Sequence, residues 1–121
     1  MNEKEFWNFF KDLQRSGKVK MVAGSISTGT DTTDPYGGYM AGHSILPSDY
    51  QNLSEKTIVQ IGNLLRMKNV AIKTKEVILI LLAHQPKKEA LIALEKYNLF
   101  PDKGLEIFAA LALDECMMWN E

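Results

Sequence analysis

The sequence predicts a mainly α-helical protein of about five helices, the last four packed as an array of antiparallel helix pairs. Apolar residues recur at helical spacing on both sides of residue 54, and the connectors beyond it suit only direct helix-on-helix packing. The chain has 121 residues, 45% hydrophobic and 24% charged, as in a typical globular domain. We therefore expect one domain over residues 1–121, with a first helix in 1–17, a loop or hairpin in 18–53 and the array in 54–121.

An amphipathic helix is expected at the N-terminus, over residues 3–15. Its apolar side chains fall within one half of the helical wheel: Phe6, Trp7, Phe9, Phe10 and Leu13. Gly17 ends this helix, because glycine readily adopts the left-handed conformation found at helix C-termini. Since so many aromatic side chains are costly to leave in water, we expect this helix to dock on the core.

The segment after this helix has the composition of turns. Residues 18–26 and 38–46 alternate weakly between apolar and polar, and residues 28–37 between them are almost all turn-forming. A small β-hairpin and one long irregular loop therefore both stay open for residues 18–47. Both place the tip of the segment at the surface.

The array begins with a helix over residues 54–67. Ser54 can cap its N-terminus, and a capping box formed by Ser48 and Gln51 permits a start as early as residue 48. Gly62 lies in the interior of this helix, where glycine costs about 1 kcal/mol relative to alanine. The sequence therefore predicts a helix with one weak position.

The second element of the array contains the run Val77–Ala83, which is apolar on every side. Periodicity alone does not separate a buried strand from a buried helix in such a run. We expect a helix because Thr74 can cap it, Glu76 lies in its first turn and Pro86 follows its end.

Two further helices complete the array. The first spans residues 86–97 with Pro86 at the first helical position, where no backbone N–H is needed. The connector that follows spans residues 99–104. The last helix presents a broad apolar face made of these residues: Leu105, Phe108, Ala109, Ala112, Leu113, Cys116 and Trp119.

Residues 74–116 carry a local pattern of alternating alanine and leucine. Asp102 stands in a turn before the run Phe108–Glu115, which reads Phe-Ala-Ala-Leu-Ala-Leu-Asp-Glu. In these features the segment resembles the HEAT and armadillo class of helical repeats. Two residues depart from the class where it usually has a basic residue: Glu106 and Ile107. The resemblance implies a scaffold that binds partners on an exposed helical face and needs a cap, for which the N-terminal helix would serve.

Charge and cysteine content bear on partners and compartment. The 14 Lys and Arg residues nearly balance the 15 Asp and Glu residues, so no global field attracts nucleic acid or an anionic membrane, and nucleic acid is not an expected partner. The longest purely apolar run, Val77–Ala83, is far shorter than the roughly 20 residues of a membrane helix. A single cysteine, Cys116, suits a reducing compartment, so we expect a cytoplasmic protein.

No phosphate loop, metal site or cofactor is predicted. Residues 24–30 contain two glycines at the spacing of a phosphate-binding loop, but Thr30 stands where a lysine is needed. Asp31, Asp34 and His43 are the only clustered candidate ligands in this region. A structural metal site normally has cysteines or several histidines, so we expect these side chains to be solvated.

Reactive side chains in the array are expected to have structural roles. His84 is expected near the C-terminus of a helix, where the helix dipole would favour its cationic form. Cys116 is expected to be a buried, inert thiol. Asp114 and Glu115 are expected on the solvated helix surface. Six basic residues near the connectors are expected to be ordinary surface side chains: Arg66, Lys68, Lys73, Lys75, Lys87 and Lys88.

Two functions stay open. In the first, the chain is a small helical interaction module that binds another protein, or a second copy of itself, through its helical face or through an aromatic segment. The candidate binding residues of that segment are Tyr36, Tyr39, His43 and Tyr50. In the second, a small enzyme closes residues 24–45 over a pocket, with His43 as acid or base and Asp31 or Asp34 orienting it. We favour the module, because no helical residue is seen to converge on His43, and no catalytic residue is predicted.

Overall fold

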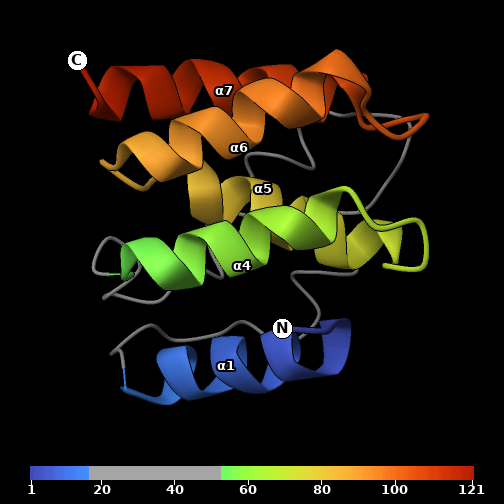
Figure 1. The fold of residues 1–121 in the computed structure, drawn as a ribbon, viewed down its shortest axis with the longest axis vertical. Helices are drawn as coiled ribbons and strands as arrows, with labels where there is room; N and C mark the ends of the chain where they lie inside the picture. Colours follow the sequence, from blue (N-terminus) through green and yellow to red (C-terminus); the bar gives the residue numbers. More distant parts are fainter. Residues whose placement is uncertain (17–52) are drawn as a thin grey trace.

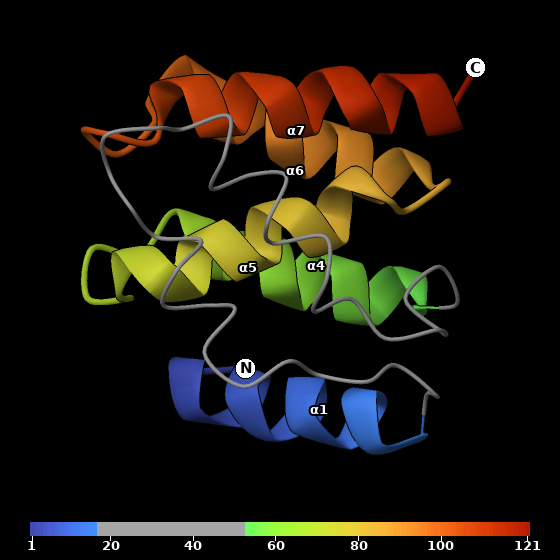
Figure 2. The same ribbon diagram turned by 180° about the vertical axis from the view of Figure 1, so that it is seen from behind.

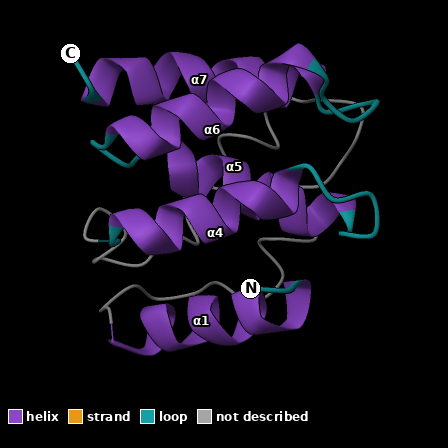
Figure 3. Cartoon of the chain, viewed as in Figure 1, coloured by secondary structure: helices purple, strands orange, loops and turns teal. Residues whose placement is uncertain are grey.

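The computed structural model describes residues 1–16 and 53–121, and five α-helices form most of them. The helices are α1 (Glu3–Ser16), α4 (Glu55–Leu65), α5 (Ile72–Ala83), α6 (Lys88–Leu99) and α7 (Glu106–Trp119). No strand occurs in these two ranges (Figure 3). The predicted, mainly α-helical fold is confirmed for the described residues, and a strand at Val77–Ala83 is excluded because this run lies within α5. The hairpin or loop predicted for residues 18–47 lies outside the described residues.

The four C-terminal helices form two layers, and consecutive helices from opposite layers run antiparallel. α4 and α6 lie side by side and run in the same direction, while α5 and α7 form the second layer and run the opposite way (Figures 1 and 2). The connector from α4 to α5, residues 66–71, and the connector from α6 to α7, residues 100–105, therefore lie at the same end of the molecule (Figure 1). No helix in the described ranges has both the length and the apolar content to cross a bilayer.

α5 lies at the centre of the hydrophobic core. It packs against α4, α6 and α7, and its run from Val77 to Ala83 is almost completely inaccessible to solvent. A helix buried on every side needs no polar face, so its sequence carries no helical period. The same core cluster includes residues from all five helices, among them Phe6 of α1 and Phe108 of α7.

α1 lies at the α4/α5 end of the stack, on the side away from α6 and α7 (Figures 1 and 2). Phe6 and Phe10 are fully buried, so the predicted docking of this helix on the core is confirmed. Polar contacts fix its first turns: Trp7 Nε1 donates to Thr74 Oγ1 at 3.0 Å, and Thr74 Oγ1 donates to the carboxylate of Glu3. α1 is thus held by both apolar burial and hydrogen bonds to α5.

The prediction that Thr74 caps α5 is wrong. The N-cap is Ala71, whose side chain makes no capping bond, and the helix begins at Ile72. The backbone N–H of Ala71 donates instead to Glu3 Oε2 at 3.1 Å. A carboxylate from α1 therefore satisfies a backbone donor at the start of α5, which leaves the Thr74 hydroxyl free to bind α1.

α4 begins where predicted, with Ser54 as N-cap accepting a hydrogen bond from Thr57 N at 3.2 Å. Leu53 and Ser54 are not helical, so α4 does not extend back to residue 48. Gly62, predicted as a weak position, faces α6: a Cβ added there would lie 2.8 Å from Ala93 Cβ. Glycine therefore lets α4 and α6 approach more closely than any other residue would.

α6 begins at Lys88, so the predicted start at Pro86 is wrong. Lys87 has an extended backbone, with φ −139° and ψ 141°, and serves as the N-cap residue without a side-chain capping bond. Its Nζ donates to the carbonyl of Leu53, which joins the start of α6 to the start of α4. Lys87, which was expected in the first turn of the helix, therefore contacts the start of α4 instead. α6 ends at Leu99.

Candidate functional site

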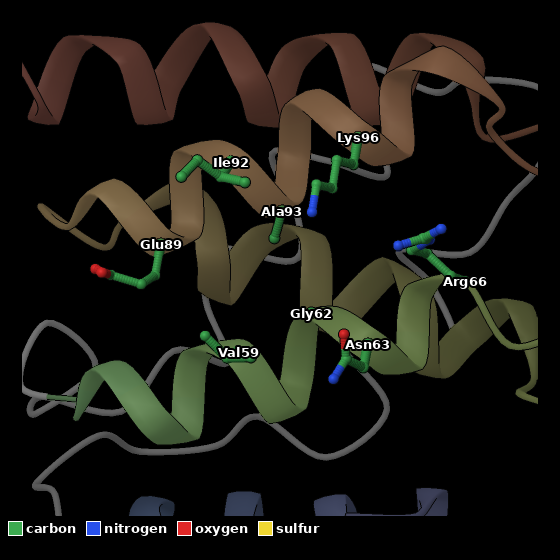
Figure 4. Close-up of a pocket in the computed structure, with 8 residues that line it drawn as sticks. All are labelled: Val59, Gly62, Asn63, Arg66, Glu89, Ile92, Ala93 and Lys96. Atoms are coloured by element: carbon green, nitrogen blue, oxygen red, sulfur yellow. The ribbon is translucent and has the colours of Figure 1, made fainter.

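A groove follows the outer face of the layer formed by α4 and α6 (Figure 4). Its volume is about 150 Å³, and eight residues line it: Val59, Gly62, Asn63, Arg66, Glu89, Ile92, Ala93 and Lys96. Val59 is 48% exposed and Ile92 is 38% exposed, so two apolar side chains on opposite walls face solvent. Figure 4 shows Glu89 at one end of the groove and Arg66 at the other, so its two ends carry opposite charges.

A larger hollow of about 550 Å³ adjoins the groove where the two connectors meet. It shares Arg66 and Lys96 with the groove. Its other lining residues are Leu65, Lys68, Lys75, Tyr97, Leu99, Phe100, Pro101 and Asp102. We call the groove and the hollow together the α4/α6 surface.

A hydrogen-bonded network shapes one wall of the hollow. Lys75 Nζ forms an ion pair with Asp102 Oδ2 at 2.7 Å, and Tyr97 Oη donates to the same oxygen at 2.6 Å. Tyr97 Oη also accepts from Asp102 N at 3.1 Å. Lys75 is 2% exposed, so the prediction of a surface lysine is wrong at this position. Its charge is tolerated in the core because Asp102 neutralises it.

The network changes the pKa of two of its members. Burial by itself would raise the pKa of Asp102, but the hydrogen bonds from Lys75 and Tyr97 outweigh it and hold the pKa of this carboxyl below its usual value. Burial, together with the hydrogen bond to Asp102, raises the pKa of the Tyr97 hydroxyl above its usual range. Asp102 therefore stays ionised and Tyr97 stays protonated at neutral pH, which is the arrangement that the network requires.

The rest of the hollow is basic and apolar. Arg66, Lys68 and Lys96 are exposed, and none of them forms an ion pair with another residue in the part of the chain that the structure describes. Leu99 is 72% exposed and Phe100 is 89% exposed at the mouth of the hollow. Two adjacent large apolar side chains held in water are typical of a contact surface.

His84 and Cys116 lie in a second polar cluster, at the opposite end of α5. His84 is the C-cap residue of α5, and its Nδ1 lies 2.8 Å from the carbonyl oxygen of Ile80. Its Nε2 lies 2.6 Å from Glu115 Oε2, so the prediction that Glu115 is free solvated surface is wrong, whereas Asp114 is exposed as expected. These contacts join the end of α5 to α7.

Cys116 is a buried thiol, as predicted. Its side chain is inaccessible, and its Sγ lies 3.7 Å from the carbonyl oxygen of Gln85 and 3.5 Å from Asn120 Nδ2. Burial raises the pKa of the Cys116 thiol to about 11, and the hydrogen bond from Asn120 offsets only part of this effect. The thiolate needed for nucleophilic chemistry is therefore scarce at neutral pH.

The binding residues predicted from the sequence all belong to residues 17–52. Tyr36, Tyr39, His43 and Tyr50 all lie outside the described residues, as do Asp31 and Asp34, so their roles stay predictions. Among residues 1–16 and 53–121, no group of three or more His, Cys, Asp or Glu side chains is placed to hold a metal ion.

The α4/α6 surface includes residues that sequence reasoning did not select. No prediction was made for Lys96, and Leu99 and Phe100 were assigned only to the connector over residues 99–104. A signal was present: Leu99 and Phe100 form an apolar pair between the end of a helix and Pro101, where no amphipathic face can bury them. Comparison of the chain with protein-family models, curated proteins and solved structures gave no match. The resemblance to HEAT and armadillo repeats stays a prediction from the sequence.

Proposed function

We propose that this chain is a small helical protein-interaction module that binds a partner protein through the α4/α6 surface. The observation that carries the proposal is that the groove and the hollow adjoin each other, since Arg66 and Lys96 line both. Two adjoining depressions along parallel helices offer a path for a segment of another protein, with exposed apolar side chains and charged groups beside it.

The composition of this surface is that of a binding site. Exposed apolar side chains occupy its middle and its mouth: Val59, Ile92, Leu99 and Phe100. Basic side chains surround them, and Phe100 supplies exposed aromatic area at the mouth of the hollow. Interfaces typically combine an apolar centre with a polar rim, and they are enriched in aromatic residues and arginine.

The surface is held in shape before any partner binds. The backbone N–H of Phe100 donates to the carbonyl of Tyr97 at 3.1 Å, and Leu105 N donates to the carbonyl of Asp102 at 3.0 Å. Gly104 has φ +94°, a conformation that permits the tight turn before α7. Because the connector is already ordered, binding loses little conformational entropy.

The proposal extends to architecture and compartment. We infer that the two helix pairs are a short array of the HEAT or armadillo kind, whose exposed helical face is the binding face. The single cysteine leaves the fold without an internal disulfide, which favours a reducing compartment such as the cytoplasm.

Site-specific photocrosslinking in the native cell tests this function. A photoreactive amino acid at Ile92 should give a defined crosslinked protein, and the yield should fall strongly when Val59→Glu is added, because a charge enters the apolar groove. The matched control carries the photoreactive residue at Asp114, an exposed position on α7. Crosslinking to a second copy of the chain would identify self-association as the interaction. Equal products from both positions, or none from Ile92, would rule out the α4/α6 surface as the binding face.

A further inference from the structure

We infer that the α4/α6 surface binds an acidic segment of a partner protein that carries apolar side chains beside its carboxylates. This inference rests on the proposed function and adds the chemistry of the partner. Two independent features of the hollow lead to it: an excess of positive charge and a pair of exposed apolar side chains.

The hollow is positively charged, although the whole chain has a slightly negative net charge. Four cationic side chains line it, Arg66, Lys68, Lys75 and Lys96, with a single carboxylate, that of Asp102. Asp102 neutralises Lys75, so three exposed cations remain, whereas the whole chain carries a formal net charge of −1. A local excess on a nearly neutral protein attracts an oppositely charged partner to one place.

Helix geometry explains only part of this charge. Lys96 lies in the last turn of α6 and Arg66 is the C-cap residue of α4, where the helix dipole favours a cation. Lys68 lies in the connector between helices, so the dipole of α4 does not account for it. The three cations also surround one concave surface and not three separate helix ends.

The apolar pair determines what kind of anion fits. Leu99 and Phe100 are adjacent in sequence, and both face solvent at the mouth of the hollow. A carboxylate bound by Arg66 or Lys96 brings neighbouring side chains of the ligand against them. Leucine, phenylalanine and similar residues in the ligand would bury this area, and each such contact removes apolar surface from water.

A nucleic acid fits these features less well than an acidic protein segment. Phosphate backbones are bound by extended basic tracks, and affinity rises with each phosphate that is neutralised. Here three free cations cluster in one hollow, and the adjoining groove ends at Glu89, which repels phosphate. Glu89 also favours a ligand that is neutral or basic where it lies over that end of the groove. The acidic part of the ligand should therefore lie at the other end, over Arg66 and Lys96.

Fluorescence anisotropy with labelled peptides tests the inference on the full chain. The probe is a short glutamate-rich peptide with a central Leu-Phe pair. Two control peptides replace either the glutamates by lysines or the Leu-Phe pair by serines. The first peptide should bind at least about ten-fold more tightly than either control, and its affinity should fall as salt is raised. A single-stranded oligonucleotide serves as the competing anion.

Charge-reversed variants locate the site. Arg66→Glu with Lys96→Glu, and separately Phe100→Ser, should each weaken peptide binding about ten-fold or more. Lys88→Glu, an exposed change at the opposite end of α6, should leave it unaltered. Two glutamates at helix C-termini should lower the thermal unfolding midpoint modestly, whereas Phe100→Ser and Lys88→Glu should leave it close to that of the unmodified chain. A cooperative unfolding transition well above the assay temperature in every variant separates loss of binding from loss of fold.

Failure of this inference differs from failure of the proposed function. Equal affinity for the acidic and lysine peptides, or tighter binding of the oligonucleotide, would overturn the acidic-segment inference. Photocrosslinking from Ile92 would still detect a protein partner of other chemistry. Unchanged peptide affinity in the charge-reversed variant would also overturn it, because the binding would then lie elsewhere.

Discussion

Asp102 shows how one side chain joins several parts of the fold. It lies in the connector before α7, accepts a hydrogen bond from Lys75 of α5 and accepts another from Tyr97 of α6. Lys75 was expected at the surface because lysine is rarely buried without a partner. Asp102, the partner of Lys75, is 27 residues away in the sequence, so no local sequence pattern predicts this ion pair. Its effect on stability should depend on pH, because the pKa of Asp102 is lowered in the folded state.

Replacing Asp102 by asparagine tests this dependence. A carboxyl whose folded pKa is depressed contributes stability that is present above the unfolded pKa of about 3.9 and is lost as pH falls towards the folded value. Between about pH 5 and pH 3, the free energy of unfolding of the unmodified chain should therefore fall more steeply than that of Asp102→Asn. At neutral pH the variant should be less stable by about 1 to 2 kcal/mol, since Lys75 keeps a buried charge without a carboxylate.

Urea unfolding at a series of pH values measures both effects. Asp114→Asn is the matched control, because Asp114 is exposed on α7 and its loss should leave the pH profile close to that of the unmodified chain. Parallel pH profiles for the Asp102→Asn variant and the unmodified chain would show that the ion pair with Lys75 does not stabilise the fold.

At the scale of helices, periodicity and caps predicted which segments fold but not always where they start. α1 and α4 begin as expected because their signals are local: an aromatic stripe in α1 and the Ser54 cap in α4. α5 and α6 begin elsewhere because contacts from remote residues decide. Glu3 of α1 binds the backbone at Ala71, and Lys87 binds the carbonyl of Leu53. Such contacts exist only once the helices have packed.

Gly62 gives the sharpest test of helix packing. The sequence alone predicts that Gly62→Ala stabilises α4, because alanine is favoured over glycine in a helix by about 1 kcal/mol. The structure predicts the opposite sign, since the added Cβ would lie 2.8 Å from Ala93 Cβ and overpacking costs about 1 to 3 kcal/mol. We therefore expect a net destabilisation of about 1 kcal/mol in the free energy of unfolding.

A double-mutant cycle separates packing from propensity. In the Ala93→Gly background the clash is absent, so Gly62→Ala should become neutral or stabilising. Chemical denaturation of the four proteins gives the coupling energy between the two positions. Additive effects, with Gly62→Ala stabilising in both backgrounds, would show that α4 and α6 are not in close contact at this point.

At the scale of the whole molecule, the two-layer arrangement creates the candidate site. Parallel α4 and α6 bring the connectors 66–71 and 100–105 to one end, where Arg66 and Lys96 meet at a shared hollow (Figure 1). The sequence predicted the basic residues of the first connector but had no means of placing Lys96 beside them. It also predicted an exposed helical face as a binding surface without stating which one, because that depends on the layer each helix joins.

The central claim is that partners are recognised on the α4/α6 surface. The most direct measurement is a titration of the isotope-labelled chain with the glutamate-rich Leu-Phe peptide, followed by changes in backbone amide NMR shifts. We predict the largest changes at Val59, Arg66, Ile92, Lys96 and Phe100, with small changes along α7. Changes centred on Tyr36, Tyr39, His43 and Tyr50, or changes spread evenly over the chain, would contradict the claim.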